Sequence, residues 1–236
     1  AGMLLASRDI VGGIAFAREQ DPIMTTAELN TVMEREKKRF AGAELMGKTL
    51  GVVGLGSIGS LVARLGLDLD MQVVGYDPAL SVEAAWRLPS DVERMDNMQT
   101  LLARSDFVSL HLPVVETTRG LLNADLLKSF RPGSCLLNFA REEVVSIEAI
   151  VDALDSGLLR KYVTDFPNPM LLGRNDALLM PHIGASTAEA EENCAVMAAN
   201  QLMLFLEHGN IRNSVNFPAI ELERTKGCRI TVSNRN

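Results

Sequence analysis

The sequence predicts an α/β protein built on a doubly wound parallel sheet. Short apolar runs alternate with segments of helical periodicity from about residue 48 to residue 207. The runs are continuously apolar, as strands are when helices cover both faces of a parallel sheet. A glycine-rich turn joins the first run to the helix after it. Strand, glycine turn and helix in this order are typical of a unit that binds a dinucleotide.

The alternation predicts a definite order of elements. The apolar runs predict strands at residues 50–53, 72–76, 107–112, 134–139, 161–166 and 176–180. Apolar spacing and capping residues predict helices at 1–19, 58–65, 97–104, 123–130, 147–154 and 186–207. Residues 21–40 are polar and include a run of mixed charge at 34–39, which is typical of a solvated face.

Composition limits the class of protein. The chain has 236 residues, of which 47% are hydrophobic and 22% are charged, enough for one large or two small globular domains. A net charge of −7 without a basic face argues against a nucleic-acid partner. Cys135, Cys194 and Cys228 are too scattered for a metal site or a disulfide framework, so we expect no metal and a reducing, cytoplasmic location. No apolar run approaches the roughly 20 residues of a membrane span, so we expect no membrane partner.

The glycine-rich turn has the sequence Gly54-x-Gly56-x-x-Gly59. In such a fingerprint the first glycine makes a tight turn, the second lets a pyrophosphate approach the backbone, and the third lets the helix pack close to the strand. Ser57 and Ile58 begin the helix, whose first N–H groups are expected to hold the phosphates. Glycines also gather in ordinary turns, so the weight of this motif comes from the strand before it and the helix after it.

An acidic residue follows the second predicted strand. Asp77 lies eighteen residues after Gly59, where a carboxylate can accept hydrogen bonds from a ribose hydroxyl. Asp77-Pro78 is also a common turn at a strand end, but beside the fingerprint we favour ribose recognition. Because a carboxylate repels a 2′-phosphate, we expect NAD rather than NADP.

Five polar residues lie at or just after the carboxyl ends of the predicted strands: His111, Asn138, Arg141, Asp165 and His182. Open parallel sheets bind their ligands at that edge. We therefore expect these side chains to surround the site.

These motifs match a family in their order. After the fingerprint and Asp77 come His111-Leu112-Pro113, Asn138-x-x-Arg141, Asp165 and a stretch from Pro181-His182 to Gly184-Ala185-Ser186-Thr187. Over about residues 1–218 the chain resembles the D-2-hydroxyacid dehydrogenases. Residues 191–218 are similar to the branch that oxidises 3-phosphoglycerate in the first step of serine biosynthesis, so the expected partner is a phosphorylated 2-hydroxy acid.

The resemblance implies a Rossmann-type domain with NAD as its cofactor. It adds several residues to the cofactor contacts expected at the fingerprint and Asp77: His111, Leu112, Pro113, Thr117, Asn138, Asp165, Gly184 and Ala185. His111 lines the nicotinamide side of the cleft or has a structural role. Asp165 matches the family's aspartate near the nicotinamide carboxamide.

The resemblance also implies two catalytic residues. His182 is the expected general base and Arg141 the expected clamp for the substrate carboxylate. The residue types suit these roles, because imidazole titrates near neutral pH and guanidinium pairs with a carboxylate through two hydrogen bonds. The plain alternatives are a capping role for His182 and a surface charge for Arg141.

Two positions depart from the family pattern. The residue after the catalytic arginine is usually glycine, but here it is Glu142. The family's Asp-Val-Phe-x-x-Glu-Pro carries the acid that pairs with the catalytic histidine. The corresponding stretch here is Asp165-Phe166-Pro167-Asn168-Pro169, without a glutamate. We therefore expect His182 to use another acid or to work without one.

The resemblance implies a division into three parts. Residues 1–209 are the expected NAD-binding domain with its N-terminal helix, 210–226 return toward a substrate domain, and 227–236 begin an ACT-like regulatory domain. A homodimer through helix 1–19 and segment 21–45 is expected, although their apolar residues could equally pack within one chain. The chain alone should bind NAD without turnover. The alternative function is an NAD-binding regulatory or corepressor module.

Overall fold

Seven parallel strands form one sheet in the order β3-β2-β1-β4-β5-β6-β7 among the residues that the structure describes. The strands are β1 (Thr49–Val53), β2 (Gln72–Tyr76), β3 (Glu93–Arg94), β4 (Phe107–Leu110), β5 (Ser134–Asn138), β6 (Leu159–Thr164) and β7 (Ala177–Leu179). The chain winds from β1 toward β3, then returns to β4 and winds the other way. This reversal confirms the predicted doubly wound sheet. Its switch point lies between β1 and β4, and sheets of this kind bind ligands at the carboxyl ends of the strands there.

The structure is a computed structural model. It describes residues 1–214, 216–223, 228, 230 and 232. The chain divides into two compact units, Ala1–His182 and Ile183–Asn236. The domain boundaries expected after residues 209 and 226 stay predictions.

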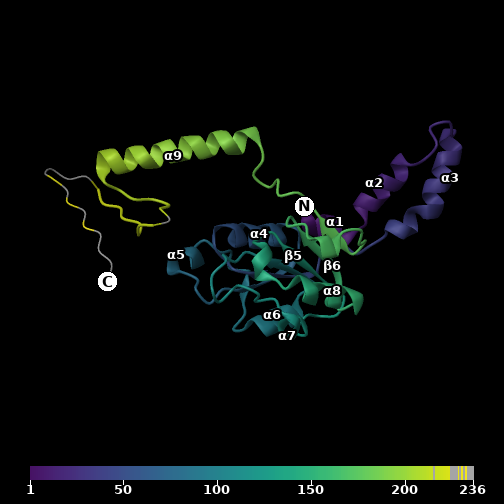
Figure 1. The fold of residues 1–236 in the computed structure, drawn as a ribbon, viewed down its shortest axis with the longest axis horizontal. Coiled ribbons are helices and arrows are strands. Elements are labelled where there is room, and N and C mark those ends of the chain that lie inside the picture. Colours follow the sequence, from purple (N-terminus) through teal and green to yellow (C-terminus); the bar gives the residue numbers. More distant parts are fainter. Residues whose placement is uncertain (215, 224–227, 229, 231, 233–236) are drawn as a thin grey trace. The chain divides into compact units, whose positions relative to one another are not determined.

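Helices cover both faces of the sheet (Figure 1). One hydrophobic cluster joins the sheet to α1 (Gly2–Ser7) and α4 (Ser57–Asp68). The other joins it to α6 (Met98–Arg104), α7 (Ala124–Leu127) and α8 (Ile147–Asp155). Successive apolar residues of each central strand enter opposite clusters, and for this reason these strands are mostly apolar on both faces.

Shorter elements connect these layers. They are α5 (Val82–Ala85) and the 3₁₀ turns η1 (Lys37–Phe40), η2 (Glu142–Val144) and η3 (Pro169–Leu171). The predicted helix at 123–130 is shorter than expected, because the N–H groups of Ser129 and Phe130 bond carbonyls three residues back. Apart from the helix predicted over residues 1–19, the other predicted strands and helices are present with ends shifted by one or two residues, or by slightly more at the helix after the fingerprint.

The expectation of one helix over residues 1–19 is wrong. The segment forms α1 and α2 (Ile10–Arg18), because Arg8 is extended and Asp9 caps a new helix. The Asp9 Oδ1 atom accepts the N–H of Gly12 at 3.0 Å. An aspartate in this position is a frequent helix start, so the break has a signal in the sequence.

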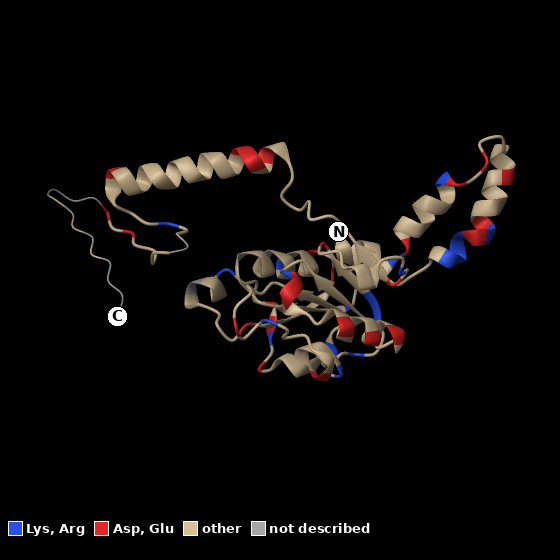
Figure 2. Cartoon of the chain, in the orientation of Figure 1, with Lys and Arg blue, Asp and Glu red and all other residues tan. Residues whose placement is uncertain are grey.

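The polar segment 21–40 contains a helix that was not predicted from the sequence, α3 (Thr26–Glu36). It begins with a capping box, in which Thr25 and Glu28 bond each other's backbone N–H groups. None of its residues is buried, as expected for a solvated face. Figure 2 shows acidic and basic residues mixed at its end, where the charge run continues into η1.

The second unit contains α9 (Ala188–His208), which Thr187 caps and which ends at Gly209 with a φ of 65°. An antiparallel bridge joins Ile211 to Ile220. Of residues 227–236 only 228, 230 and 232 are described, so the expected regulatory-domain strand lies outside the described residues. Across the described part of the chain, no helix has both the length and the apolar character that crossing a membrane requires.

The helix after the fingerprint lies against the preceding turn without intervening side chains. A Cβ atom on Gly59 would be 1.9 Å from the carbonyl oxygen of Gly54. Gly54 has a φ of 89°, which favours glycine, and a Cβ there would be 2.5 Å from the carbonyl oxygen of His111. The turn therefore needs glycine at both positions.

Gly59→Ala is expected to destabilise the domain by about 1–3 kcal/mol, because the new methyl group would overlap the Gly54 carbonyl. Urea or thermal unfolding measures the effect. Gly56→Ala is the matched control, since nothing lies within 4 Å of a Cβ built there. Its unfolding midpoint should stay much closer to that of the unsubstituted chain, and equal losses would contradict the close approach.

Candidate functional site

Six neighbouring strands end beside one another at a single edge, because the whole sheet is parallel. In their spatial order these ends carry Asp77 after β2, the fingerprint after β1, His111 after β4, Asn138 and Arg141 at β5, Asp165 after β6, and His182 after β7. The sheet therefore brings the predicted residues of the first unit to one edge. The cofactor candidates Asp77, the fingerprint and His111 lie on one side of it, and the catalytic candidates lie on the other.

The fingerprint leaves open space where a phosphate would approach. Gly56 caps α4, and no atom lies within 4 Å of a Cβ built on it. Ser57 begins the helix, and the side chain of Ile58 is exposed. A helix start with unpaired N–H groups and no side chain over it is suited to an anion, so the backbone fits the pyrophosphate of NAD.

Asp77 connects the fingerprint to the second strand. Its Oδ2 atom accepts the N–H of Leu55 at 2.9 Å, and its Oδ1 atom accepts the N–H of Ala79 at 2.9 Å. The second bond is the turn that the alternative interpretation expects at a strand end. Each carboxylate oxygen can accept more than one hydrogen bond, so Asp77 holds the turn and still has acceptor capacity for a ribose.

Two hollows continue from Asp77 along the fingerprint. The larger, of about 910 Å³, has Asp77 on its wall together with apolar side chains of Leu55, Pro78, Leu80, Val92 and Met95. The smaller, of about 260 Å³, is lined by Gly56, Ser57 and Ser60. Leu55 and Ser81 line both hollows. An apolar wall with a few polar groups is typical of small-molecule sites, and the part contributed by residues 78–96 was not predicted from the sequence.

His111 lies behind the fingerprint rather than in open solvent. Its Nε2 atom is 2.9 Å from the Oγ atom of Ser109. Burial lowers the pKa of His111 to about 4, because a charged imidazolium is poorly solvated there. The side chain is therefore neutral at physiological pH, in agreement with the structural alternative for this residue, and its predicted NAD contact stays a prediction.

The loop after β4 is held by the side chain of Thr118. Its Oγ1 atom donates to the carbonyl of Pro113 at 2.6 Å and accepts the N–H of Val115 at 2.9 Å. Leu112 packs against the fingerprint, because a Cβ on Gly54 would be 3.2 Å from its methyl group. Thr117 is exposed. The predicted cofactor contacts of Leu112, Pro113 and Thr117 stay predictions.

Asn138 has a positioning role within the protein. Its Nδ2 atom donates to the carbonyl of Arg141 at 2.9 Å and to the hydroxyl of Tyr162 at 3.3 Å, and its Oδ1 atom accepts the N–H of Ala140. The side chain is fully buried. These bonds shape the turn that carries Arg141, and the predicted contact of Asn138 with NAD stays a prediction.

Arg141 is exposed, and its Nη1 atom donates to the carbonyl of Ala140 at 2.6 Å. Within the described residues its guanidinium forms no ion pair. A guanidinium held only by a neighbouring carbonyl can turn toward an incoming carboxylate and pair with it through two hydrogen bonds.

Asp165 is buried and has an acceptor without a partner. Its Oδ1 atom lies away from solvent and forms no hydrogen bond among the described residues. A buried polar atom without a partner is costly, and it is satisfied when a bound molecule supplies a donor. The nearby Tyr162 hydroxyl is also buried, and this burial raises its pKa. Asp165 therefore fits a donor group on the cofactor, such as a carboxamide.

His182 is exposed in the loop after β7. Its ring packs edge-on against Phe166, with ring centroids 5.1 Å apart and ring planes at 88°. Among the described residues, His182 has no carboxylate within ion-pair distance. Phe166 is thus the contact that orients the ring, and its role was not expected from the sequence. Gly184 and Ala185 belong to the second unit, so their predicted cofactor contacts stay predictions.

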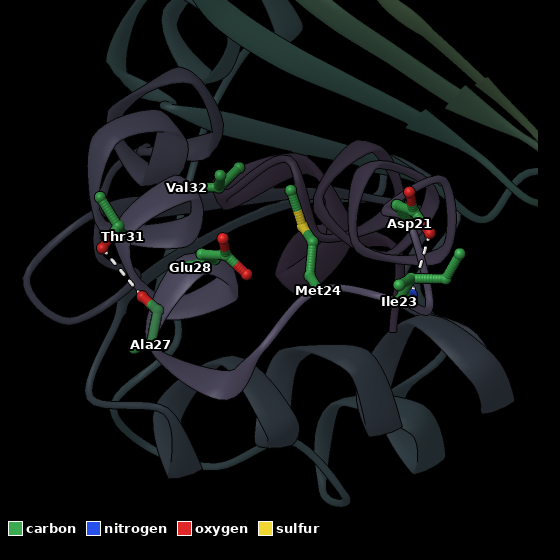
Figure 3. Close-up of a pocket in the computed structure, with 7 residues that line it drawn as sticks. All are labelled: Asp21, Ile23, Met24, Ala27, Glu28, Thr31 and Val32. Carbon is green, nitrogen blue, oxygen red and sulfur yellow. Dashed lines mark hydrogen bonds between the residues drawn. The ribbon is translucent and has the colours of Figure 1, made fainter.

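Figure 3 shows a hollow of a different kind, formed by residues 21–32 alone. Its volume is about 620 Å³, and Ile23, Met24 and Val32 are among its lining residues. The hydrogen bonds drawn in it connect near neighbours: Thr31 to the Ala27 carbonyl and the Ile23 N–H to Asp21. It contains none of the predicted site residues, and we assign it no ligand.

Comparisons with known proteins agree with this geometry. The family model of the "D-isomer specific 2-hydroxyacid dehydrogenase, NAD binding domain" matches residues 3–184. The chain is 33% identical over 223 residues to D-3-phosphoglycerate dehydrogenase of Methanocaldococcus jannaschii. The aligned residues are 92% of this chain and 42% of that protein. The enzyme of the same name from Mycobacterium tuberculosis is 36% identical over 223 residues, or 91% of this chain and 39% of that protein. The chain thus spans about two-fifths of the length of these relatives.

Two solved structures with a similar fold are named as a dehydrogenase and a reductase. D-mandelate dehydrogenase of Rhodotorula graminis superposes with a TM-score of 0.73 at 29% identity, over 86% of this chain and 59% of that chain. A glyoxylate reductase of Paecilomyes thermophila superposes with a TM-score of 0.73 at 27% identity, over 91% of this chain and 62% of that chain. Because the family model matches residues 3–184, which is more than half of the chain, the chain belongs to the D-isomer specific 2-hydroxyacid dehydrogenases and contains their NAD-binding domain.

Proposed function

We propose that this chain is the coenzyme-binding part of a dehydrogenase that transfers a hydride between a D-2-hydroxy acid and NAD. The observation that carries the proposal is the placement of Arg141, Asp165 and His182 after three adjacent strands, β5, β6 and β7. A module that only binds NAD needs the fingerprint and an acid for the ribose. It needs neither an arginine nor a histidine at the same edge.

Each of the three residues has a chemical role in this proposal. The nicotinamide ring, when bound, supplies the hydride acceptor. Arg141 binds and orients the substrate carboxylate. The unpaired oxygen of Asp165 accepts a hydrogen bond from the carboxamide of the nicotinamide. His182 takes the hydroxyl proton as the carbonyl forms, since an imidazole accepts protons near neutral pH.

The proposed substrate is 3-phosphoglycerate or a related D-2-hydroxy acid, which would place the reaction at the first step of serine biosynthesis. The support is that the relatives from M. jannaschii and M. tuberculosis are named D-3-phosphoglycerate dehydrogenases. We propose the cytoplasm as the location, since the three scattered cysteines suit a reducing compartment.

A homodimer through the N-terminal helices is part of the same proposal. No residue of α2 or α3 is buried. Ile10, Val11, Ile14 and Ile23 are large apolar side chains with exposed surface in this segment. Apolar surface of this kind is typical of a subunit interface.

His182→Ala is expected to lower turnover by about 10²–10⁴-fold in the dehydrogenase that combines this domain with a substrate domain. The proton acceptor is lost while the fingerprint is untouched, so the Kd for NAD should stay the same. Steady-state oxidation of 3-phosphoglycerate and an NADH fluorescence titration measure the two effects. His208→Ala, at the end of α9, is the control that should change neither. Retained turnover in His182→Ala would remove the residue from the mechanism.

Asp77→Ala is expected to reduce the preference for NAD over NADP by on the order of tenfold, because the ribose loses its acceptor and a 2′-phosphate is no longer repelled. Affinity for both cofactors should fall somewhat, since the carboxylate also holds the Leu55 N–H. Asp77→Asn keeps one acceptor without the charge and should mainly improve NADP binding. Equal losses for the two cofactors would show that Asp77 only holds the turn.

The second candidate function is an NAD-binding regulatory or corepressor module without turnover. The absence of an ion-pair partner for His182 among the described residues favours it. A steady-state assay with 3-phosphoglycerate and NAD separates the two functions when it is done on the complete protein that combines this domain with a substrate domain. Turnover above the uncatalysed rate excludes the regulatory module, and NAD binding without turnover of any D-2-hydroxy acid excludes the dehydrogenase.

A further inference from the structure

The two departures from the family pattern contact each other in the structure. Glu142 begins η2 directly after Arg141, and Asn168 lies in the loop after β6. The Nδ2 atom of Asn168 donates to the Oε1 atom of Glu142 at 3.2 Å, although 26 residues separate them. The two unusual side chains therefore form a pair.

The orientation of Asn168 is determined by a second hydrogen bond. Its Oδ1 atom accepts the N–H of Met170 at 3.0 Å and so caps η3. A backbone N–H can bond only the oxygen of the amide, so the amide nitrogen must point away from Met170. That nitrogen is the atom that reaches Glu142. An aspartate at position 168 could form the cap but could not donate to Glu142.

The pair connects the two chain segments that lead to the predicted catalytic residues. On one side Arg141 precedes Glu142 directly, and the carbonyl of Arg141 is held by Asn138 at 2.9 Å. On the other side Asn168 lies two residues after Phe166, whose ring contacts His182. A continuous series of bonds and contacts thus runs from Arg141 to His182.

We propose that Glu142 and Asn168 are a positioning pair that holds Arg141 at a fixed spacing from Phe166 and His182. The proposal rests on the proposed dehydrogenase function. His182 has a ring contact but no carboxylate partner among the described residues, so its orientation depends on the loop that carries Phe166. Small displacements of catalytic groups matter, because an error of about 1 Å can lower a rate on the order of 100-fold.

The test exchanges donor and acceptor within the pair. Asn168→Asp keeps the cap on Met170 but places two carboxylates against each other, so kcat should fall by about tenfold or more with a much smaller change in the Kd for NAD. Adding Glu142→Gln to Asn168→Asp restores one donor and one acceptor with the direction reversed. In this double variant kcat should return to within about twofold of the unsubstituted enzyme.

Glu143→Gln is the matched control, because Glu143 is the adjacent exposed glutamate and its side chain is not part of the pair. All variants are compared in the complete dehydrogenase by kcat, KM, the Kd for NADH and the midpoint of thermal unfolding. An Asn168→Asp enzyme with normal kcat, or a double variant no better than Asn168→Asp, overturns the proposal. Losses of kcat that only follow losses of stability overturn it as well. An unsubstituted enzyme without turnover overturns the proposed function itself, and that failure is evident before any variant is compared.

Discussion

The close approach of α4 to the carboxyl end of β1 is the constraint on which the rest of the site depends. It requires glycine at position 59, where a Cβ would lie 1.9 Å from the Gly54 carbonyl oxygen. Because β1 pairs with β2 and β4, the same turn contacts the residue after each of these strands. The Leu55 N–H bonds Asp77, and the His111 carbonyl lies behind Gly54. A larger residue at position 59 would move the helix away from both partners and from the space where the phosphates are expected.

Local patterns predicted most of the fold. Continuous apolar runs and a glycine turn are properties of neighbouring residues, so the parallel sheet and its binding edge could be inferred from the sequence. The errors at the N-terminus are also local. The N-cap at Asp9 divides the expected helix, and the capping box of Thr25 and Glu28 begins a helix in a polar segment where none was predicted. In each case the capping residue, and not apolar periodicity or charge, decides where the helix begins.

The interior of the site could not be predicted in the same way, because its contacts join residues that are distant in sequence. The cofactor contact expected of Asn138 stays a prediction, but the bonds of its side chain to Tyr162, 24 residues away, and to the carbonyl of Arg141 were not foreseen. The sequence shows that an asparagine ends the strand, but not that a tyrosine hydroxyl on the adjacent strand lies beside it. The contact of Phe166 with His182 is of the same kind. Whether a polar residue at a strand end binds a ligand or supports another residue is decided by the neighbouring strand.

The same reasoning explains how a glutamate can stand beside the arginine that is proposed to bind a carboxylate. A free carboxylate next to Arg141 would compete with the substrate for the guanidinium. In the described part of the chain, Glu142 instead accepts a hydrogen bond from Asn168, and Arg141 donates to the carbonyl of Ala140. A neutral backbone carbonyl is a weaker partner for a guanidinium than a carboxylate is, so a substrate can displace it. A glutamate beside Arg141 is therefore compatible with substrate binding because the loop after β6 carries an amide donor that faces it.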